Sequence, residues 1–420
     1  MTDVPSHLSA REAAMRVVAG VRCQPPLRVP LDDALGMVLA DDVRSPVDVP
    51  PRTSSSMDGY AARAADVRGA TAERPAVLRL VERIPAGSVP TRALGPGECA
   101  RVFTGSPVPA GTDTVVRQED AAADGEHVRI VTDRDAGANL RQPGEDIRRD
   151  AVALTAGLPL RAAHLGVLAS LGIGAPMVVR RPRVAILCCG DEVADVDRPD
   201  EIQDGRRIGN ASGHALRALI RQAGGEPVDL GIASDTLGSI RDHLARAADA
   251  DLVVTAGGIS VGDHDQVRAA VQASGGAVDF WRVRIRPGGP VAAGSVAGIP
   301  WVGLPGNPVS AMVTCELFVR PAIRKMAGHA EPFRRCRPVR TAAAISLRPT
   351  LQHFLRAVVS GDGEGREARL TGPQGSGILS SMAAANALLI VPEGQHETPA
   401  GAGLSALLLD EAEHQGEPGF

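Results

Sequence analysis

Three glycine-containing stretches carry the residues whose types and spacing could do chemistry. In chain order they are "CCGDEV" (188–193), "TAGGISVGDHD" (255–265) and "VGLPGNPVSA" (302–311), and each begins in an apolar run. The carboxyl ends of parallel strands meet at one edge of a sheet, where helix N-termini direct free amides outward. We therefore expect the three stretches to form one pocket lined by backbone amides, suited to a phosphorylated or nucleotide-bearing ligand.

Glycines and carboxylates have separate tasks in the first two stretches. Gly257 and Gly258 let a ligand approach the backbone closely. Glu192 and Asp265 are two carboxylates that could hold a hard cation such as Mg²⁺. The alternative for an acid in these turns is a helix N-cap in solvent, which suits Asp263 better than Asp265.

The third stretch reads as a turn from a strand into a helix. Asn307 can act as the helix N-cap, and Pro308 then occupies the first helical position, where a missing N–H costs nothing. The prolines would hold the turn rigid while the free amides of the helix face an anion. Taken singly, each stretch is also explained as an ordinary tight turn or cap, and the prediction depends on all three reaching one sheet edge.

Three further segments could contribute to a site. They are "SSSMDGYA" (54–61), "NLRQPGEDIRRD" (139–150) and "IRPGGP" (285–290). The first is either a ligand loop or a hydroxyl-rich loop with an Asp-Gly turn. The second is either a solvated loop or the rim of an anion site, because arginines surround its Pro-Gly turn and two acids. The third places Arg286 beside a flexible turn, which could also be a simple hairpin.

The hydrophobic periods predict the elements that must position these residues. From about 45 to 140, Pro and Gly interrupt short Val-rich runs, which is typical of a β-rich module. Between 183 and 326, strand-like runs alternate with helical ones, which predicts a doubly wound parallel sheet with helices on both faces. The predicted helices are 211–223, 236–248, 264–274 and 308–326. We therefore expect a multidomain α/β protein with a helical, linker-like N-terminal part and a small all-β C-terminal domain.

Composition excludes several classes of partner. The 420 residues carry a net charge of only −4, without a long run of like charges, so neither nucleic acid nor a membrane surface is an expected partner. The N-terminus lacks the apolar core of a signal peptide, and no segment offers the ~18 apolar residues of a membrane span. We expect a cytoplasmic protein.

The nucleophiles and metal-binding side chains show no pattern of their own. The six cysteines have no CxxC spacing, and the ten histidines show no ligand spacing. No Ser/His/Asp order, Walker A loop or HExxH motif is present. Catalysis by positioning and electrostatics is therefore the expectation, rather than attack by a protein nucleophile.

Seven motifs in this order closely resemble the molybdopterin molybdenumtransferase family and the E domain of gephyrin. They are "SSSMDGYA", "FTGSPVP", "PGEDI", "CGDEV", "TAGGISVGDHD", "RPGGP" and "GLPGNPVSA", and the resemblance runs from about residue 5 to 410. It implies an elongated homodimer with its cleft between the α/β domain of one subunit and the β-rich domain of the other. The implied domains are a linker domain (5–44 with 140–174), a β-rich domain (45–139), an α/β domain (175–329) and a C-terminal β-barrel-like domain (330–411).

The resemblance also implies an activity and its residues. Enzymes of this family take adenylylated molybdopterin and molybdate and, with Mg²⁺, release AMP and leave molybdenum on the dithiolene sulfurs. Binding of the pterin and nucleotide is assigned to Ser56, Asp58, Thr104, Gly190, Asp191, Gly257, Gly258, Ser260, Gly262, Pro305, Asn307, Pro308 and Ser310. The metal is assigned to Glu192, Asp265 and Asn210, and catalysis to Arg141, Asp146, Arg286, Arg356 and Ser376. Thr104, Arg141 and Asp146 would come from the partner subunit, and molybdopterin adenylyltransferase and molybdoenzyme acceptors are the implied partners.

One motif departs from the family's pattern in charge. Where the family usually has Lys-Pro-Gly-Lys-Pro, this chain has Arg-Pro-Gly-Gly-Pro (286–290). Arg286 can replace the first lysine's charge with a different geometry, whereas Gly289 cannot replace the second. We expect Arg282, Arg284 or Arg286 to compensate.

Two other positions also differ from the family's pattern. Together with the altered motif, they leave alternative functions open. Thr53 stands where the family has an acid, and Asn210 where it has an aspartate, with Ser212 where asparagine is usual. Together with Gly289 these residues favour a protein that holds molybdopterin without turning it over. A scaffold for partner enzymes and a paralogue that selects tungstate are further alternatives.

Overall fold

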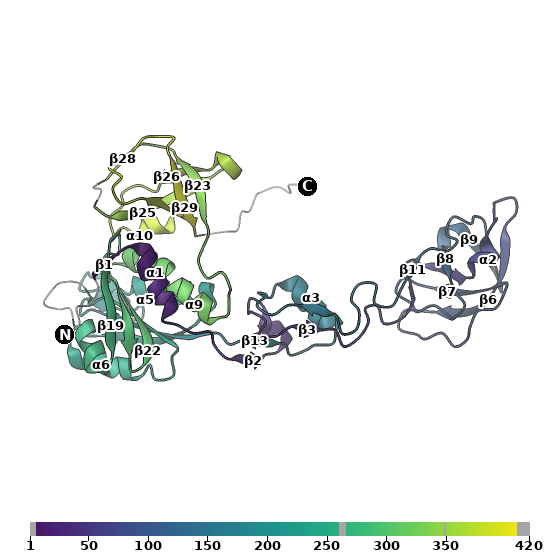
Figure 1. The fold of residues 1–420 in the computed structure, drawn as a ribbon, viewed down its shortest axis with the longest axis horizontal. Helices are drawn as coiled ribbons and strands as arrows, with labels where there is room; N and C mark the ends of the chain where they lie inside the picture. The colour runs from purple at the N-terminus through teal and green to yellow at the C-terminus, as the bar shows by residue number, and fades with distance from the viewer. Residues whose placement is uncertain (1–5, 260–265, 348–349, 410–420) are drawn as a thin grey trace.

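The chain forms an elongated arrangement of four domains (Figure 1). The computed structural model describes residues 6–259, 266–347 and 350–409. In Figure 1 the α/β domain lies at one end, a small linker domain lies in the middle, and the β-rich domain lies at the far end. The C-terminal domain lies beside the α/β domain.

A seven-stranded sheet forms the α/β domain. Its order is β1 (Ser6–Leu8), β19 (Ala277–Val283), β21 (Ala292–Val296), β22 (Ile299–Leu304), β18 (Leu252–Ala256), β14 (Arg183–Cys189) and β17 (Glu226–Ala233). The strands β22, β18, β14 and β17 are parallel, as the alternation of strand and helix predicts. β21 is antiparallel to both its neighbours, which the sequence pattern did not predict. The reason is a two-residue turn at Ala297 and Gly298, both with positive φ, which joins β21 to β22 as a hairpin.

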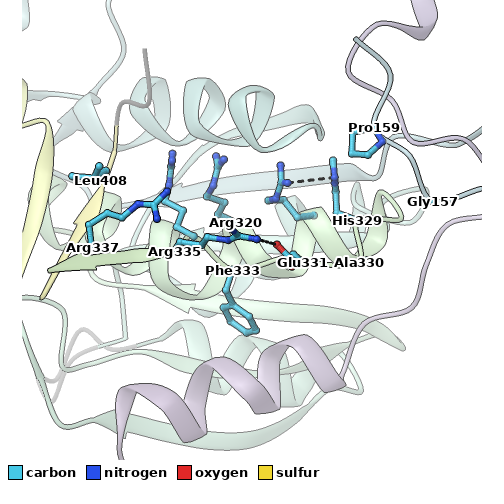
Figure 2. A pocket seen from close by; sticks show the side chains of 12 residues that line it. Gly157, Pro159, Arg320, His329, Ala330, Glu331, Phe333, Arg335, Arg337 and Leu408 are labelled. Atoms are coloured by element: carbon cyan, nitrogen blue, oxygen red, sulfur yellow. Dashed lines mark hydrogen bonds and ion pairs between the residues drawn. The ribbon is translucent and has the colours of Figure 1, made fainter. Parts of the chain in front are cut away.

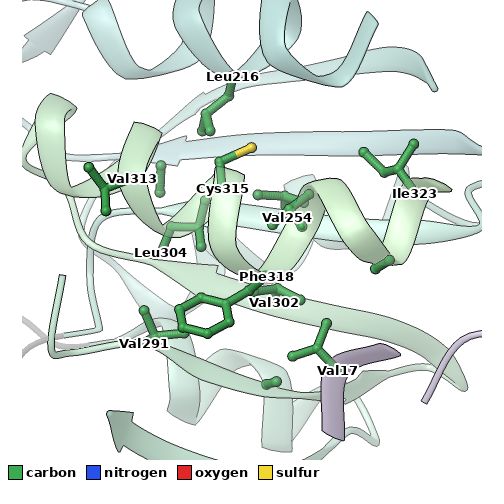
Figure 3. Close-up of a cluster of buried hydrophobic side chains, with 14 of the residues drawn as sticks. Val17, Leu216, Val254, Val291, Val302, Leu304, Val313, Cys315, Phe318 and Ile323 are labelled. Carbon is green, nitrogen blue, oxygen red and sulfur yellow. The ribbon is translucent and has the colours of Figure 1, made fainter. Parts of the chain in front are cut away.

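Helices cover both faces of this sheet, which confirms the predicted doubly wound class. One face packs against α1 (Ala10–Ala19), α5 (Ala211–Ala223), α8 (Pro308–Thr314), the π-helical segment η3 (Cys315–Val319) and α9 (Arg320–Met326), and the other against α6 (Leu237–Ala245) and α7 (Val267–Ala273). Along β14, Val184 and Ile186 enter the first core, and Ala185 and Leu187 enter the second. Figure 3 shows the first core around Phe318, a fully buried side chain. Burial on both sides explains why β14 reads as a continuous apolar run.

The first two elements belong with the α/β domain rather than with the linker domain to which residues 5–44 were assigned. β1 pairs with β19, and α1 buries Ala13 and Val17 in the α/β core. Ser9 and Glu12 form a capping box that starts α1. The physical reason is the apolar stripe of α1, which needs a large core and finds it beside η3 and α9.

The linker domain is formed by two separate parts of the chain. It contains β2 (Pro26–Arg28), the 3₁₀-helix η1 (Leu31–Ala34), β3 (Val43–Arg44), β12 (Val152–Leu154), α3 (Ala162–Ser170) and β13 (Met177–Val179). The pairs β3–β12 and β2–β13 bring the parts together around a small core. Because β13 pairs here, the linker domain extends past residue 174, where its end was predicted.

The β-rich domain contains a six-stranded sheet. Its order is β8 (Thr114–Arg117), β5 (Gly59–Ala62), β7 (Glu98–Val102), β6 (Ala76–Ile84), β10 (His127–Ile130) and β9 (Ala121–Asp124). A one-turn helix, α2 (Ala64–Val67), and the 3₁₀-turn η2 (Gln118–Asp120) complete it. The predicted β-rich region is confirmed.

The C-terminal domain is a closed barrel, which confirms the predicted small all-β domain. The pairings link β25 (Gln352–Ser360), β26 (Glu367–Leu370), β23 (Cys336–Thr341), β29 (Gly403–Leu408) and β27 (Ala387–Val391), and β27 returns to β25. A two-stranded piece, β24 (Ile345–Ser346) with β28 (Glu397–Thr398), and the helix α10 (Leu379–Ala383) accompany it. The barrel is joined to the α/β domain because β20 (Ile285–Arg286) pairs with β25 and because Phe354 and Leu388 enter the α/β core.

Candidate active site

The loops after β14, β18 and β22 contact one another at the carboxyl edge of the parallel strands. Gly257 has φ of +98°, and its amide donates to Leu304 O at 3.0 Å. A Cβ on Gly257 would lie 2.5 Å from Cys189 O, and a Cβ on Gly306 would lie 3.4 Å from the Gly257 Cα. Only glycine therefore fits at Gly257, and the three loops form a surface of closely packed backbone.

The loop after β14 presents the carboxylate predicted to serve a metal. Glu192 is exposed, and its carboxylate lies over Gly190, where a Cβ would be 2.7 Å from Glu192 Oε2. Within the described part of the chain the Glu192 carboxylate has no hydrogen bond or ion pair, so its oxygens are available to a ligand. Asp191 is tied instead to the next loop, since the Asp235 amide lies 3.4 Å from its Oδ1. Burial raises the pKa of the preceding Cys188 thiol to about 12, so this thiol stays protonated.

Asn210 and Ser212 fix the start of α5 at the same edge. Asn210 is 5% exposed, and its Oδ1 accepts from the Gly213 amide at 3.0 Å as a helix N-cap. Ser212 Oγ donates to Gly306 O at 3.1 Å, which ties α5 to the loop after β22. The capping bond occupies part of the Asn210 oxygen, so the predicted metal role would require it to serve two partners.

The turn into α8 is built as the sequence predicts, with one difference. Asn307 stands at the N-cap position and Pro308 at the first helical position, but the Asn307 side chain makes no capping hydrogen bond. Asn307 is exposed, whereas Pro305 and Ser310 are buried beneath it. The side-chain amide of Asn307 is therefore available to a ligand instead of being used by the helix.

Of the three arginines expected to replace the missing lysine, only Arg286 has no partner among the described residues. Arg284 Nε lies 3.1 Å from the Glu393 carboxylate, and the Arg282 guanidinium stacks 4.4 Å from the Trp281 ring. Arg286 is exposed at the end of β20, beside the C-terminal domain. It is thus the cation best placed to meet an anion at this junction.

The C-terminal domain contributes a loop that Arg356 holds in place. Arg356 is fully buried, and its guanidinium donates to Ser381 Oγ at 3.0 Å and to Gly375 O at 2.9 Å. Burial lowers the pKa of this guanidinium. The loop also carries Ser376, which is half-buried. Arg356 was expected to reach into the cleft, and its side chain instead points toward the Ser376 loop and positions it.

A second cluster lies at one end of the β-rich domain. β4 (Ser54–Ser55) pairs with β11 (Leu140–Arg141), which places the exposed Arg141 beside the serine loop. Asp58 Oδ1 accepts from both the amide and the hydroxyl of Thr104 at 2.8 Å. These two hydrogen bonds lower the pKa of Asp58. The Ser56 amide donates to Asn139 O at 3.0 Å, so the loop is held on both sides.

The two clusters belong to domains that lie at opposite ends of the molecule (Figure 1). Asp146 lies on the exposed loop that leads back to the linker domain, where its amide donates to Val49 O at 3.0 Å. No single copy of the chain therefore brings Arg141 or Asp146 to Gly257.

Several predicted residues lie outside the described part of the chain. They are Ser260, Gly262, Asp263 and Asp265. Among the residues that the structure describes, no three His, Cys, Asp or Glu side chains gather as a metal site would require. Within the same residues, no helix combines the length and apolar character needed to cross a bilayer.

Two positioning residues were missed by sequence reasoning. Gln374 Oε1 accepts from the Arg356 amide at 2.8 Å, and Ser381 Oγ accepts from the Arg356 side chain. The signal for Gln374 was the turn-rich stretch "TGPQGSG" (371–377) just before a helix. Ser381 lies within α10 and offered no local signal.

Comparison with known proteins identifies the family. The models "MoeA N-terminal region (domain I and II)", "Probable molybdopterin binding domain" and "MoeA C-terminal region (domain IV)" match residues 8–172, 185–325 and 338–409. Molybdopterin molybdenumtransferase 2 of Mycobacterium tuberculosis is 37% identical over 393 residues, which are 92% of this chain and 96% of the relative. The chain belongs to the molybdopterin molybdenumtransferase family. This confirms the resemblance seen in the motifs and makes the protein a transferase of molybdenum cofactor biosynthesis.

Other members of the molybdopterin molybdenumtransferase family agree over nearly the whole length. The molybdopterin molybdenumtransferase of Nostoc sp. is 37% identical over 384 residues, which are 90% of this chain and 86% of the relative. The crystal structure of the molybdopterin biosynthesis moeA protein of Pyrococcus horikoshii superposes with a TM-score of 0.82 at 27% identity, over 97% of this chain and 100% of that one. The four-domain arrangement is thus shared with a solved structure.

Proposed function

We propose that the protein inserts molybdenum from molybdate into adenylylated molybdopterin, with release of AMP. The observation that carries this proposal is the closely packed backbone surface at the carboxyl edge of β14, β18 and β22, which the glycines at 257 and 306 allow to form. The start of α8 lies at the same edge and favours negative charge, as phosphate groups require. The named relatives and the order of the family models support the same activity.

The oxyanion is best placed at the junction with the C-terminal domain. Arg286 provides a charge without a partner among the described residues, and Arg356 positions the Ser376 loop. Guanidinium groups and hydroxyls held in fixed positions stabilise an oxyanion without reorganising during the reaction. These groups would hold molybdate beside the sulfurs that replace its oxygens.

The second cluster would complete the cleft from a partner subunit. Asp58, Thr104 and Arg141 are exposed on the β-rich domain, which lies at the opposite end of the molecule from the α/β domain of the same subunit. A twofold homodimer would bring the β-rich domain of one copy to the α/β domain of the other, giving two equivalent sites. The same arrangement would hold Asp146 at the rim.

The described residues fit a magnesium ion in part. Glu192 supplies one carboxylate whose oxygens make no other bond in the described chain, and oxygen ligands are those that Mg²⁺ prefers. Asp265 would supply the second. A bound Mg²⁺ would neutralise charge on the phosphoryl bridge, and the backbone loops around Gly257 would orient that bridge.

The decisive experiment measures AMP release from adenylylated molybdopterin by the purified protein. Release that depends on both molybdate and Mg²⁺ is expected. Tight binding of the substrate without release would contradict the proposal and establish the carrier instead. The carrier is the second candidate because Gly289 offers no charge where the family has a lysine, and its Cβ position faces only the carbonyls of Ile285 and Val283.

The shared cleft has its own test, in which two impaired variants are mixed. R286A removes a charge from the α/β half, and D58A removes a carboxylate from the other half. If each site draws on two subunits, co-expression of the two variants restores about a quarter of wild-type turnover, because heterodimers keep one intact site. If each site lies within one subunit, the mixture turns over no faster than the two variants measured separately, and the homodimer proposal is wrong.

We also propose a cellular compartment and two partner enzymes. We place the protein in the cytoplasm, where molybdopterin adenylyltransferase would supply its substrate and molybdoenzymes would accept its product. Pull-down of the purified protein with each of these enzymes, before and after loading with cofactor, tests the two contacts.

A further inference from the structure

An arginine-lined cavity lies where three domains meet, away from the candidate active site. It measures about 550 Å³ and is bounded by α9, the segment 328–337, the linker domain at Gly157 and Pro159, and Leu408 of the barrel. Figure 2 shows arginine side chains in a row across it, with Arg337 near Leu408 and His329 toward Pro159. Along the continuous helix from α8 to α9, Arg320 lies about 18 Å from Pro308. The cavity is therefore separate from the turn at Asn307.

The charges that line this cavity are strongly unbalanced. Its ionised side chains are Arg320, Arg324, Arg334, Arg335, Arg337 and Glu331. Glu331 is paired with Arg335 at 2.7 Å, and the buried Glu316 beneath the wall is paired with Arg334 at 2.9 Å. Among the described residues, these two pairs leave Arg320 and Arg337 without a hydrogen-bonded carboxylate, and the cavity attracts anions.

Among these arginines, Arg320 gives the strongest indication of a bound anion. Its side chain is 12% exposed, and Nε and Nη1 make no hydrogen bond to the described residues. The nearest carboxylate oxygen, on Glu316, is 3.7 Å from Nε and is already shared with Arg334. Burial lowers the pKa of this guanidinium. Buried donors without acceptors cost free energy, and a bound anion would satisfy them.

His329 reports the same positive field. Its Nδ1 lies 3.3 Å from Arg324 Nη2. Burial and the charges of Arg324 and Arg320 lower the pKa of His329 to about 4. The imidazole is therefore uncharged at neutral pH, as expected where neighbouring positive charges oppose its protonation.

The helix that forms the wall is locally irregular. The π-helical segment Cys315–Val319 interrupts the helix just before Arg320, and it holds Glu316 between Arg320 and Arg334. Such segments are rare and occur frequently at functional sites. The irregular helix is therefore a second observation that supports a functional role for this cavity.

We propose that this cavity binds a phosphate-bearing small molecule with at least two adjacent negative charges. Guanidinium groups pair with phosphate oxygens through two parallel hydrogen bonds, and the cavity has the size of a small-molecule site. A bound anion contacts the α/β domain through Arg320, the segment before the barrel through Arg335, and the linker domain beside Pro159. It thereby holds the three domains in one relative position.

The test is calorimetric titration of the full-length protein with inorganic pyrophosphate and with ADP, at constant ionic strength. Binding of either probe to this cavity supports the proposal, and the comparison shows whether the phosphate is free or part of a nucleotide. R320M is expected to weaken binding by at least about tenfold, because it removes the buried donors. R335M with R337M, at the exposed rim, tests the site without disturbing the wall.

Two matched controls isolate the cavity. R369M removes an exposed arginine of the barrel (74% exposed) and is expected to bind the probe as the wild type does. R286M removes the charge at the candidate active site and is expected to leave unchanged the binding event that R320M weakens. Loss of binding in R286M but not in R320M would overturn the proposal by assigning the anion to the catalytic cleft. An R335M/R337M variant that loses dimer mass and keeps its pyrophosphate binding would overturn it as well, because the arginines would then serve a subunit contact.

Discussion

A ligand would meet different kinds of group at the carboxyl edge of the α/β sheet and at the second cluster, on the β-rich domain. At the first, backbone atoms packed around Gly257 and Gly306 form the surface. At the second, side chains do so, with Asp58 held by Thr104 and Arg141 exposed beside it. A surface built from closely packed backbone cannot accept an added side-chain atom without moving. A surface built from side chains can lose one side chain while the remaining groups keep their positions.

This difference suggests how the work is divided in the proposed cleft. Close approach to the backbone suits the phosphate and nucleotide portion, whose binding requires amides in fixed positions. Side chains on a separate domain suit the part of the substrate that must be admitted and released. The following variants test that division, beginning with the largest expected effect on turnover.

Gly257→Ala should have the largest effect. The new Cβ would lie 2.5 Å from Cys189 O at a φ of +98°, so both strain and displacement of the backbone are expected. We expect a loss of about 3 kcal/mol in the free energy of unfolding and a loss of turnover of at least about 100-fold. Gly298→Ala is the control, because it has φ of +81° and no atom within 4 Å of the Cβ position. Equal effects of the two variants on turnover would contradict a backbone-built surface.

Arg356→Met should have the second-largest effect on turnover, because Arg356 acts through the Ser376 loop. Losing the hydrogen bonds to Ser381 and Gly375 should lower turnover by roughly 10- to 100-fold through misplacement of the loop. Substrate affinity should change less, which separates kcat from KM. Arg340→Met, which removes one surface hydrogen bond to Gly401 O in the same domain, should leave both unchanged. A change in KM alone would mean that Arg356 touches substrate through a route that this structure does not show.

Asp58→Ala should have a smaller effect, about tenfold on turnover, since a side-chain surface loses one group without displacing its neighbours. The melting temperature should stay close to that of the wild type, because Asp58 is exposed. Asp133→Ala removes a comparable exposed carboxylate that accepts from the Gly69 amide at 2.9 Å, and it should be neutral for turnover. If Asp133→Ala impaired turnover as much as Asp58→Ala, the loss would reflect the domain rather than the site.

The pH dependence at His329 should leave turnover unchanged and affect stability alone. The pKa of His329 is about 4 in the folded chain against the ordinary 6.5 of a histidine, so the unfolded chain binds the proton first as the pH falls. Stability should therefore decrease between pH 6.5 and 4, by about 1–2 kcal/mol after screening by solvent. Urea unfolding of wild type and H329N across this range measures the difference. A wild type with the same pH profile as H329N would show that His329 does not carry the dependence.

Periodicity and turn chemistry account for the parts of the fold that were predicted. The continuous apolar run of β14 and the helical repeat of α5 and of the segment from α8 to α9 depend on near neighbours in the chain, so the local sequence specifies them. The glycines at 257 and 258 and the Asn-Pro start of α8 mark turns for the same reason. Their convergence on one edge then follows from the parallel connections.

The features that were not predicted depend on contacts between distant segments. β1 joins the sheet through β19, more than 250 residues away in the chain, and β21 enters it as an antiparallel strand through a short hairpin. Arg356 points inward because α10 covers it with Ser381. The arginine cavity exists only because α9, the segment before the barrel and the linker domain meet.

The sequence by itself therefore determined the family, the domain classes and the three loops at the sheet edge, because motifs and hydrophobic periods are local properties. Only the tertiary structure decided which arginine lacks a partner, that Arg356 positions a loop, and that the two halves of the candidate site belong to domains at opposite ends of the molecule. The physical reason is that burial, pairing and distance arise when segments far apart in sequence pack together, and no local pattern encodes them.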